Sequence, residues 1–322
     1  MLGGSDPALV AVPTQHESLL GALRVGEQID DDVALVVTTS GTTGPPKGAM
    51  LTAAALTASA SAAHDRLGGP GSWLLAVPPY HIAGLAVLVR SVIAGSVPVE
   101  LNVSAGFDVT ELPNAIKRLG SGRRYAAAAA GITVVRTYGM SETSGGCVYD
   151  GVPLDGVRLR VLAGGRIAIG GATLAKGYRN PVSPDPFAEP GWFHTDDLGA
   201  LESGDSGVLT VLGRADEAIS TGGFTVLPQP VEAALGTHPA VRDCAVFGLA
   251  DDRLGQRVVA AIVVGDGCPP PTLEALRAHV ARTLDVTAAP RELHVVNVLP
   301  RRGIGKVDRA ALVRRFAGEA DQ

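Results

Sequence analysis

The feature that most constrains this chain is a strand-like run, then a turn of glycine and hydroxyl residues, then a helix-forming segment. Val33–Thr39 is dominated by β-branched residues, as is typical of a strand buried on both faces. Ser40–Gly48 supplies the turn, and the alanine-rich segment Thr52–Arg66 favours a helix. Ser72–Val77 and Ile82–Ala94 repeat the alternation of strand and helix. We therefore predict an α/β domain of layered sheets and helices, with a mainly parallel sheet.

The pattern changes in the second half of the chain. Val157–Leu162 and Arg166–Ile169 flank a glycine turn and predict a β-hairpin. Farther on, Leu273–Leu284 has an apolar stripe at helical spacing, and apolar strand-like runs lie on either side of it. We expect a large N-terminal domain over residues 1–213 and a small α+β domain over residues 214–322.

Composition excludes several classes of protein. The chain has 322 residues and a net charge of −5, which provides no basic surface for nucleic acid. The N-terminus lacks a signal-peptide pattern, and the alanine-rich stretch Thr52–Ala63 is too short and too polar to span a bilayer. Three cysteines, Cys147, Cys244 and Cys268, show no CxxC pairing. We expect a cytoplasmic enzyme with reduced thiols and no membrane insertion.

The turn after the first strand favours phosphate binding. Its glycines let the backbone approach an anion, its N–H groups form a nest, and its hydroxyls and one lysine add donors. It is not a Walker A loop, because Pro46 and Gly48 flank the lysine. The alternative is an ordinary solvated turn. The candidate binding residues are Thr39, Ser40, Gly41, Thr42, Thr43, Gly44 and Lys47.

The full string Thr38–Gly48 resembles the signature loop of the adenylate-forming superfamily, which contains acyl-CoA synthetases, carrier-protein adenylation domains and luciferases. The resemblance implies ATP and Mg²⁺ as cofactors and coenzyme A as co-substrate. It also implies a large N-terminal domain that binds AMP and the acyl group, followed by a small mobile C-terminal domain.

Tyr138–Glu142 resembles the family's YGxTE motif. By that match Tyr138, beside Gly139, stacks on adenine. Ser141 binds the α-phosphate, and Glu142 holds Mg²⁺, a hard cation that prefers oxygen ligands.

Trp192–Leu198 resembles the family's TGD segment, which makes Asp197 the acceptor for the ribose hydroxyls. Asp196 stands where the family usually has glycine. The string that begins at Gly213 resembles the hinge sequence, with Arg214 on ribose or phosphate and Asp216 as the pivot.

Two later motifs complete the resemblance. Gly222 and Gly223 resemble the loop on the coenzyme A side. Gly305–Arg309 resembles the loop that delivers the catalytic lysine, here Lys306. Taken alone, that lysine is an ordinary solvated charge, and its assignment depends on all the motifs occurring in the family's order.

The acyl pocket is predicted from small residues and one histidine. Pro79-Tyr80-His81 resembles the segment that gates the acyl pocket, so His81 is a further candidate catalytic residue. Ser144 and Gly145 leave room for an aromatic ring. The string Thr137–Gly151 resembles the branch of the family that activates o-succinylbenzoate in menaquinone synthesis. A residue for the second carboxylate of such a substrate is not evident.

One stretch departs from the family. Between Tyr125 and Gly131 relatives place about 40 further residues, far more than the few-residue connection left here. Either the printed sequence joins two segments across an omitted stretch, or a deletion has removed a βα unit. A true deletion would expose apolar surface and unpaired strand groups.

Three alternatives therefore stay open. The chain could activate another aryl or aliphatic acid, or load a carrier protein. It could also be a non-catalytic AMP-binding relic, if the missing segment is a real loss. A homodimer is expected from the family resemblance alone.

Overall fold

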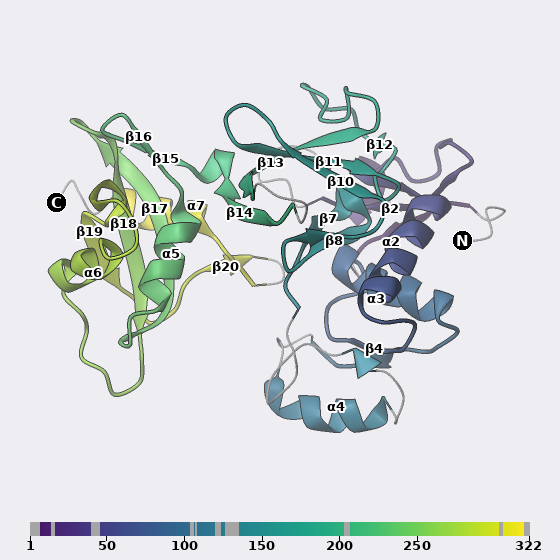
Figure 1. Ribbon diagram of the computed structural model, residues 1–322, viewed down its shortest axis with the longest axis horizontal. Coiled ribbons are helices and arrows are strands. Elements are labelled where there is room, and N and C mark those ends of the chain that lie inside the picture. The colour runs from purple at the N-terminus through teal and green to yellow at the C-terminus, as the bar shows by residue number, and fades with distance from the viewer. Residues whose placement is uncertain are drawn as a thin grey trace. The chain divides into compact units, whose positions relative to one another are not determined.

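The computed structural model describes residues 7–13, 17–39, 46–103, 106, 108–119, 124–125, 135–202, 207–302 and 305–318 (Figure 1). The chain divides into two compact units. The first comprises Met1–Ala163, Ile167–Thr195 and Leu201–Thr210, and the second comprises Gly164–Arg166, Asp196–Ala200 and Val211–Gln322. The predicted domain boundary at residue 213 stays a prediction.

The first sheet of unit one is mixed, so the prediction of a mainly parallel sheet is wrong here. Its order is β1-β2-β3-β12, with β1 and β2 parallel and the other pairs antiparallel. The phosphate-type turn leads into β3, where the sequence had predicted a helix directly. The chain reverses at Gly48, whose φ is +69° and where an added Cβ would come within 2.7 Å of Leu23. The strands are β1 (Leu9–Ala11), β2 (Val33–Val37), β3 (Ala49–Thr52) and β12 (Gly177–Tyr178).

Two predicted helices of the first unit are confirmed almost to the residue. α2 (Ala53–Arg66) is capped by Thr52, whose Oγ1 accepts the Ala55 N–H at 3.0 Å. α3 (Ile82–Ile93) packs beside α2, as Figure 1 also shows. Apolar residues of both helices and of the buried strand β2 form one core, so the sheet and the helix layer are joined. The short α1 (Glu17–Ala22) precedes β2.

A second, parallel sheet has the order β5-β4-β6. Leu74 of its central strand packs against Leu112, Ala115 and Leu119, in and just after α4. Within the described residues, this sheet stops at β6, immediately before the stretch where the family departure is predicted. Its elements are β4 (Ser72–Leu75), β5 (Val99–Glu100), η1 (Val109–Glu111), α4 (Leu112–Arg118) and β6 (Arg124–Tyr125).

The strands that follow form two further sheets. The predicted hairpin is confirmed as β10 and β11, which belong to a sheet of order β10-β11-β13-β14. A separate sheet has the order β7-β8-β9. The elements are β7 (Thr137–Met140), η2 (Ser141–Thr143), β8 (Gly145–Tyr149), β9 (Val152–Pro153), β10 (Val157–Val161), β11 (Arg166–Gly171), β13 (Trp192–Leu201) and β14 (Leu209–Arg214).

The second unit is a small α+β fold built on the long strands β17 and β18. Alternate residues of these strands enter two different cores. One core contains residues of α5 and α6, and the other contains residues of α7, so helices cover both faces of the sheet. The elements are η3 (Ala215–Glu217), β15 (Ile219–Thr221), β16 (Phe224–Val226), α5 (Pro228–Gly236), β17 (Val241–Asp251), β18 (Gly255–Val264), α6 (Leu273–Val280), η4 (Val286–Ala288), β19 (Glu292–Val295), β20 (Arg301–Arg302), β21 (Lys306–Val307) and α7 (Arg309–Ala317).

Among the residues that the structure describes, none of the helices combines the length and the apolar character needed to cross a bilayer.

Candidate active site

The phosphate-type turn is described only at its two ends. Ser40, Gly41, Thr42, Thr43 and Gly44 lie outside the described residues. Thr39 lies just after β2, and its Oγ1 is buried without a hydrogen-bond partner among the described residues. A buried hydroxyl without a partner is unfavourable in isolation. It therefore fits a site whose partner is a ligand such as a phosphate oxygen.

A short segment around β12, residues 175–180, ties the exit of this turn to the rest of the unit. The Asn180 N–H donates to the carbonyl of Lys47 at 3.0 Å, and the Arg179 N–H donates to that of Gly48 at 2.7 Å. The Asn180 side-chain amide donates to the carbonyl of Pro46 at 2.7 Å. Sequence reasoning did not single out this segment. Its signal is a Gly-Tyr-Arg-Asn string with strand character.

Glu142 is the buried carboxylate of the site. It lies in η2 and is only 7% exposed. Its Oε1 accepts a hydrogen bond from the Tyr178 hydroxyl at 2.6 Å, and its backbone carbonyl accepts the Ala175 N–H at 2.8 Å. Ser141 beside it is also buried. A fixed carboxylate oxygen is the donor type that Mg²⁺ prefers, so Glu142 fits the predicted metal role.

Lys47 is brought to the same place. Its Nζ lies 5.3 Å from the centroid of the Tyr178 ring, which is within cation–π range. One tyrosine thus contacts both the lysine of the turn and the carboxylate of the YGxTE-like motif. The two predicted residues come from segments almost one hundred positions apart, and the structure brings them together.

The predicted acyl-pocket residues lie around the start of α3. His81 is the residue before that helix, and its ring lies 4.7 Å from the ring of Tyr80. Gly145 has φ +106°, and an added Cβ would lie 3.3 Å from the Cβ of Ala86 in α3. The Ser144 hydroxyl donates to the carbonyl of Thr173 at 2.9 Å. Ser144 is buried and its hydroxyl is engaged within the fold, so its pocket role stays a prediction.

The predicted adenine residues lie in β7, which pairs with β8. Tyr138 is half-buried and packs at the edge of a core cluster. An added Cβ at Gly139 would lie 2.1 Å from the Gly145 carbonyl oxygen, so only glycine fits there.

The predicted hinge residues form an ion-pair network in the second unit. Arg214 donates to both carboxylate oxygens of Asp216, each at 2.8 Å. Its guanidinium also lies 3.6 Å from Asp197 and 3.7 Å from Asp196, and Asp196 accepts from Arg166 at 2.8 Å. The hydrogen bond from Arg214 lowers the pKa of the Asp216 carboxyl. The aspartate that replaces the family glycine is therefore engaged by two arginines.

The remaining predicted residues are exposed in the second unit. Gly222 and Gly223 have φ of +59° and +83° and connect β15 to β16. Two consecutive left-handed residues are the pattern of a type I′ hairpin turn, so both glycines have a structural role. Lys306 opens β21, and its main chain pairs with Arg302 of β20.

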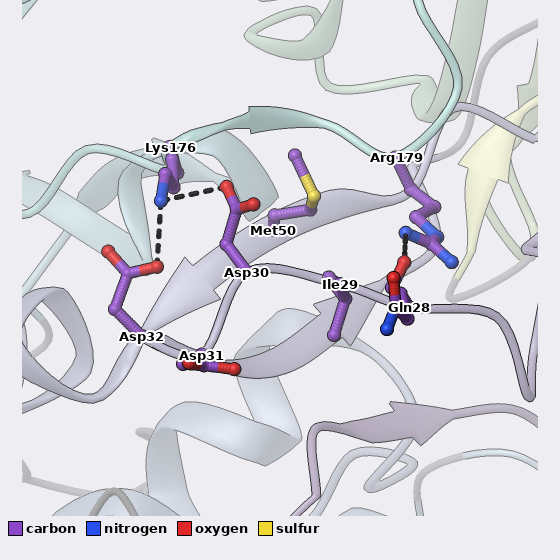
Figure 2. A pocket seen from close by; sticks show the side chains of 8 residues that line it. All are labelled: Gln28, Ile29, Asp30, Asp31, Asp32, Met50, Lys176 and Arg179. Carbon is purple, nitrogen blue, oxygen red and sulfur yellow. Dashed lines mark hydrogen bonds and ion pairs between the residues drawn. The ribbon is translucent and has the colours of Figure 1, made fainter.

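Figure 2 shows an acidic loop that contacts the outer side chains of the segment around β12, residues 175–180. Lys176 Nζ pairs with Asp30 and with Asp32, each at 2.8 Å, and Arg179 Nη1 donates to the Gln28 carbonyl at 2.7 Å. Four acidic residues, Asp30, Asp31, Asp32 and Glu27, lie close together in this loop. The aspartates that pair with Lys176 are more than half exposed.

Comparison with known families supports these motifs. The family model described as AMP-binding enzyme matches residues 21–122, and the model described as AMP-binding enzyme C-terminal domain matches residues 230–306.

Two similar proteins are named for different acid substrates. A probable 2-succinylbenzoate–CoA ligase of Mycobacterium tuberculosis is 89% identical over 362 residues, covering 100% of this chain and 94% of the relative. A sulfoacetate–CoA ligase of Cupriavidus necator is 30% identical and covers 95% of this chain and 71% of the relative. With 322 residues against 362 aligned, 40 aligned positions lack a residue in this chain. Those positions are 11% of the alignment, which is enough to account for the whole departure from 100% identity.

The solved structure of o-succinylbenzoate CoA synthetase (MenE) from Bacillus subtilis, with the acyl-adenylate intermediate OSB-AMP, has a TM-score of 0.75. It is 27% identical, covering 87% of this chain and 69% of that chain. The same enzyme is known in complex with ATP and a magnesium ion. The chain therefore has the adenylate-forming fold and belongs to the AMP-binding enzyme family that its motifs resemble.

Proposed function

We propose that this chain is an AMP-forming acid–CoA ligase that converts 2-succinylbenzoate, ATP and coenzyme A to 2-succinylbenzoyl-CoA, AMP and pyrophosphate in menaquinone biosynthesis. The observation that carries the proposal is the cluster of Lys47, Tyr178 and Glu142 at the exit of the phosphate-type turn. The name of the 89%-identical relative and the OSB-AMP complex of the Bacillus subtilis enzyme support the substrate.

The first step joins two anions, because a carboxylate oxygen attacks the α-phosphorus of ATP and pyrophosphate leaves. Catalysis must therefore place positive charge and donors around the phosphates and align the attack. Lys47 and the unpartnered hydroxyl of Thr39 supply such groups in the first unit. Glu142 would hold the Mg²⁺ that accompanies ATP, whose charge stabilises the leaving pyrophosphate. Lys306 would bridge the attacking carboxylate and the α-phosphate.

In the second step the thiolate of coenzyme A attacks the acyl carbon, a C–S bond forms, and AMP leaves with the electron pair of the broken C–O bond. Lys306 is not required there. We propose that a rotation about Asp216 withdraws Lys306 from the reacting groups. The same rotation brings the Gly222-Gly223 turn to the path by which the coenzyme A thiol enters, a hinge-type rearrangement.

We propose that the acyl pocket near Ser144, Gly145 and His81 selects the acid. Small residues there leave room for an aromatic ring, which favours 2-succinylbenzoate over a small aliphatic acid. The 30%-identical relative is named for sulfoacetate, so the family accommodates other acids. Loading of a carrier protein is the remaining alternative within the enzyme class.

Pyrophosphate release with a panel of acids, with and without coenzyme A, tests this proposal. We expect acid-dependent release with 2-succinylbenzoate and thioester formation with coenzyme A. Strong turnover only with a non-aromatic acid would show that the named substrate is wrong. Transfer only to a carrier protein would move the chain to the adenylation domains.

Lys306→Ala tests whether Lys306 acts in the first step and not in the second. We expect adenylation to be lost while thioester formation from pre-made acyl-AMP is largely kept. Equal loss of both half-reactions would contradict the domain rotation.

A second candidate, a non-catalytic AMP-binding relic, is favoured by the 40 aligned positions that this chain lacks. We place them near residues 125–131, which fall almost wholly outside the described residues. Mass spectrometry of the intact protein from its native cells decides whether the loss is real, since a true loss gives 32.8 kDa. Nucleotide binding without adenylation of any acid would then favour the relic.

We also propose a cytoplasmic location and a homodimer. A cytoplasmic location agrees with three free cysteines, of which Cys147 is buried. A homodimer is proposed from the family resemblance alone, and sedimentation at micromolar concentration would test it.

A further inference from the structure

A tyrosine that sequence reasoning left unassigned contacts both charges of the candidate site. The Tyr178 hydroxyl donates to Glu142 Oε1 at 2.6 Å, the short distance typical of a charge-assisted O–H···O⁻ bond. Lys47 Nζ lies 5.3 Å from the centroid of the same ring. The residue therefore uses its polar end on the carboxylate and its π face on the lysine.

The ring of Tyr178 is held by aromatic packing. Its ring meets Phe187 edge-on, with centroids 5.4 Å apart and an interplanar angle of 80°, and Phe187 lies 4.7 Å from the ring of Phe193. Phe193 is buried. The ring is thus part of a packed aromatic row, so its hydroxyl has little freedom to move.

The main chain beside Tyr178 is tied to the same two residues. Three positions before it, the Ala175 N–H bonds to the Glu142 carbonyl, and two positions after it, the Asn180 N–H bonds to the Lys47 carbonyl. The segment around β12 therefore fixes the backbones of Glu142 and Lys47 as well as their side chains. A group that touches neither substrate nor metal can in this way set the geometry of groups that do.

We propose that Tyr178 is a positioning residue that fixes the orientation in which Glu142 presents its carboxylate to Mg²⁺ and Lys47 presents its ammonium group to the phosphates. The inference rests on the proposed function only for the identity of the ligand, MgATP.

The test uses Tyr178→Phe, which keeps the ring and its packing on Phe187 and removes only the hydroxyl. The matched control is Tyr149→Phe, which removes the hydroxyl that accepts from buried Arg90 elsewhere in the first unit. The probe is Mn²⁺ with ATP, measured by the loss of the free Mn²⁺ electron paramagnetic resonance signal. Thermal unfolding of each variant is recorded beside it.

We expect Tyr178→Phe to weaken Mn²⁺ binding in the presence of ATP by about 10-fold or more, the usual effect of losing a partner that orients a metal ligand. Metal-free ATP should bind as in the unmodified protein, because the ring under Lys47 remains. Tyr178→Leu should weaken metal-free ATP binding as well. Tyr149→Phe should leave Mn²⁺ binding unchanged.

A double-mutant cycle separates positioning from a general loss of structure. In Glu142→Gln the carboxylate is gone, so adding Tyr178→Phe should weaken Mn²⁺ binding little further. Additive losses, or unchanged Mn²⁺ affinity in Tyr178→Phe, would overturn the proposal.

This outcome is distinguishable from failure of the proposed function. If the protein forms no acyl-CoA yet binds Mn²⁺–ATP in a Tyr178-dependent way, the positioning role stands and the ligase proposal falls. If turnover is normal and Tyr178→Phe binds Mn²⁺ normally, the ligase proposal stands and the positioning role falls.

Discussion

Each unit withdraws an arginine from solvent, Arg90 fully and Arg309 in part, and the two arginines have very different partners. Arg309 in α7 donates to Glu217 at 2.9 Å, to both oxygens of Glu232 at 2.7 and 2.8 Å, and to the Val246 carbonyl at 3.0 Å. Arg90 in α3 is more deeply buried, at 8% exposure.

The partners of Arg90 are neutral. It donates to the Tyr149 hydroxyl at 3.0 Å and lies 4.9 Å from the Trp73 ring centroid. Its Nε is buried and has no hydrogen-bond partner in the part of the chain that the structure describes. Burial lowers the pKa of its guanidinium.

The difference lies in how each unit compensates a withdrawn positive charge. In the second unit two carboxylates, from η3 and α5, and a carbonyl of β17 accept from Arg309. In the described part of the first unit the contacts of Arg90 are the neutral Tyr149 hydroxyl and the Trp73 ring of β4.

Removing Arg309 should have the largest effect. Arg309→Met leaves two partly buried carboxylates, Glu217 and Glu232, without their cation, and losing charge-assisted hydrogen bonds of this kind costs about 2 kcal/mol. Hydrogen exchange of the β17 and β18 amides, read by mass spectrometry, measures the second unit. Unchanged protection of these strands would contradict the claim that this network stabilises it.

The matched change Arg90→Met should act in the opposite sense or not at all. Replacing a poorly paired buried cation by an apolar side chain is neutral or stabilises by about 1 kcal/mol. Both tryptophans, Trp73 and Trp192, belong to the first unit, so urea unfolding followed by their fluorescence reports on it. A loss of more than about 2 kcal/mol would mean that the Tyr149 and Trp73 contacts suffice for the charge.

A smaller effect is expected on the pH dependence of the first unit. Burial, and next the charge of Arg90, lower the pKa of His64 below its ordinary value of about 6.5. The unfolded chain therefore binds a proton that the folded chain resists, and the stability from neutral His64 is complete above about pH 6.5 and is lost as pH falls toward the folded pKa.

Arg90→Met should weaken this dependence without abolishing it, because burial is the larger cause. The measurement is tryptophan-monitored urea unfolding between pH 7.5 and 5. Identical pH profiles for the unmodified protein and Arg90→Met would show that Arg90 does not affect the pKa of His64.

Thiol labelling should show the smallest difference between the units. Burial raises the pKa of Cys147 in the first unit to about 11 and that of Cys244 in the second to about 12, so both resist alkylation. Exposed Cys268 should react alone with iodoacetamide at pH 8. Early labelling of Cys147, located by peptide mass spectrometry, would show that the first unit opens locally.

Local patterns made much of this fold predictable. The β-branched run at Val33 and the capped alanine-rich helix α2 fold where their residues indicate. The strand β3 was missed because Ala49–Thr52 is short and directly adjoins the helix-forming run. α6 ends four residues before the predicted Leu284.

The candidate site was only partly predictable. Lys47 and Glu142 were found because each lies in a recognisable motif. Tyr178 was missed because its importance comes from β12 pairing with β3 across the fold, and no pattern within its own segment records that contact. The partners of Arg90 are non-local in the same way.

Exchange of radiolabelled pyrophosphate into ATP, driven by 2-succinylbenzoate and Mg²⁺, tests the central claim most directly. We predict exchange that requires the acid and is lost in Glu142→Gln and in Lys306→Ala. A protein of intact mass 32.8 kDa that binds ATP but shows no exchange with any acid would contradict the claim that this chain activates a carboxylate.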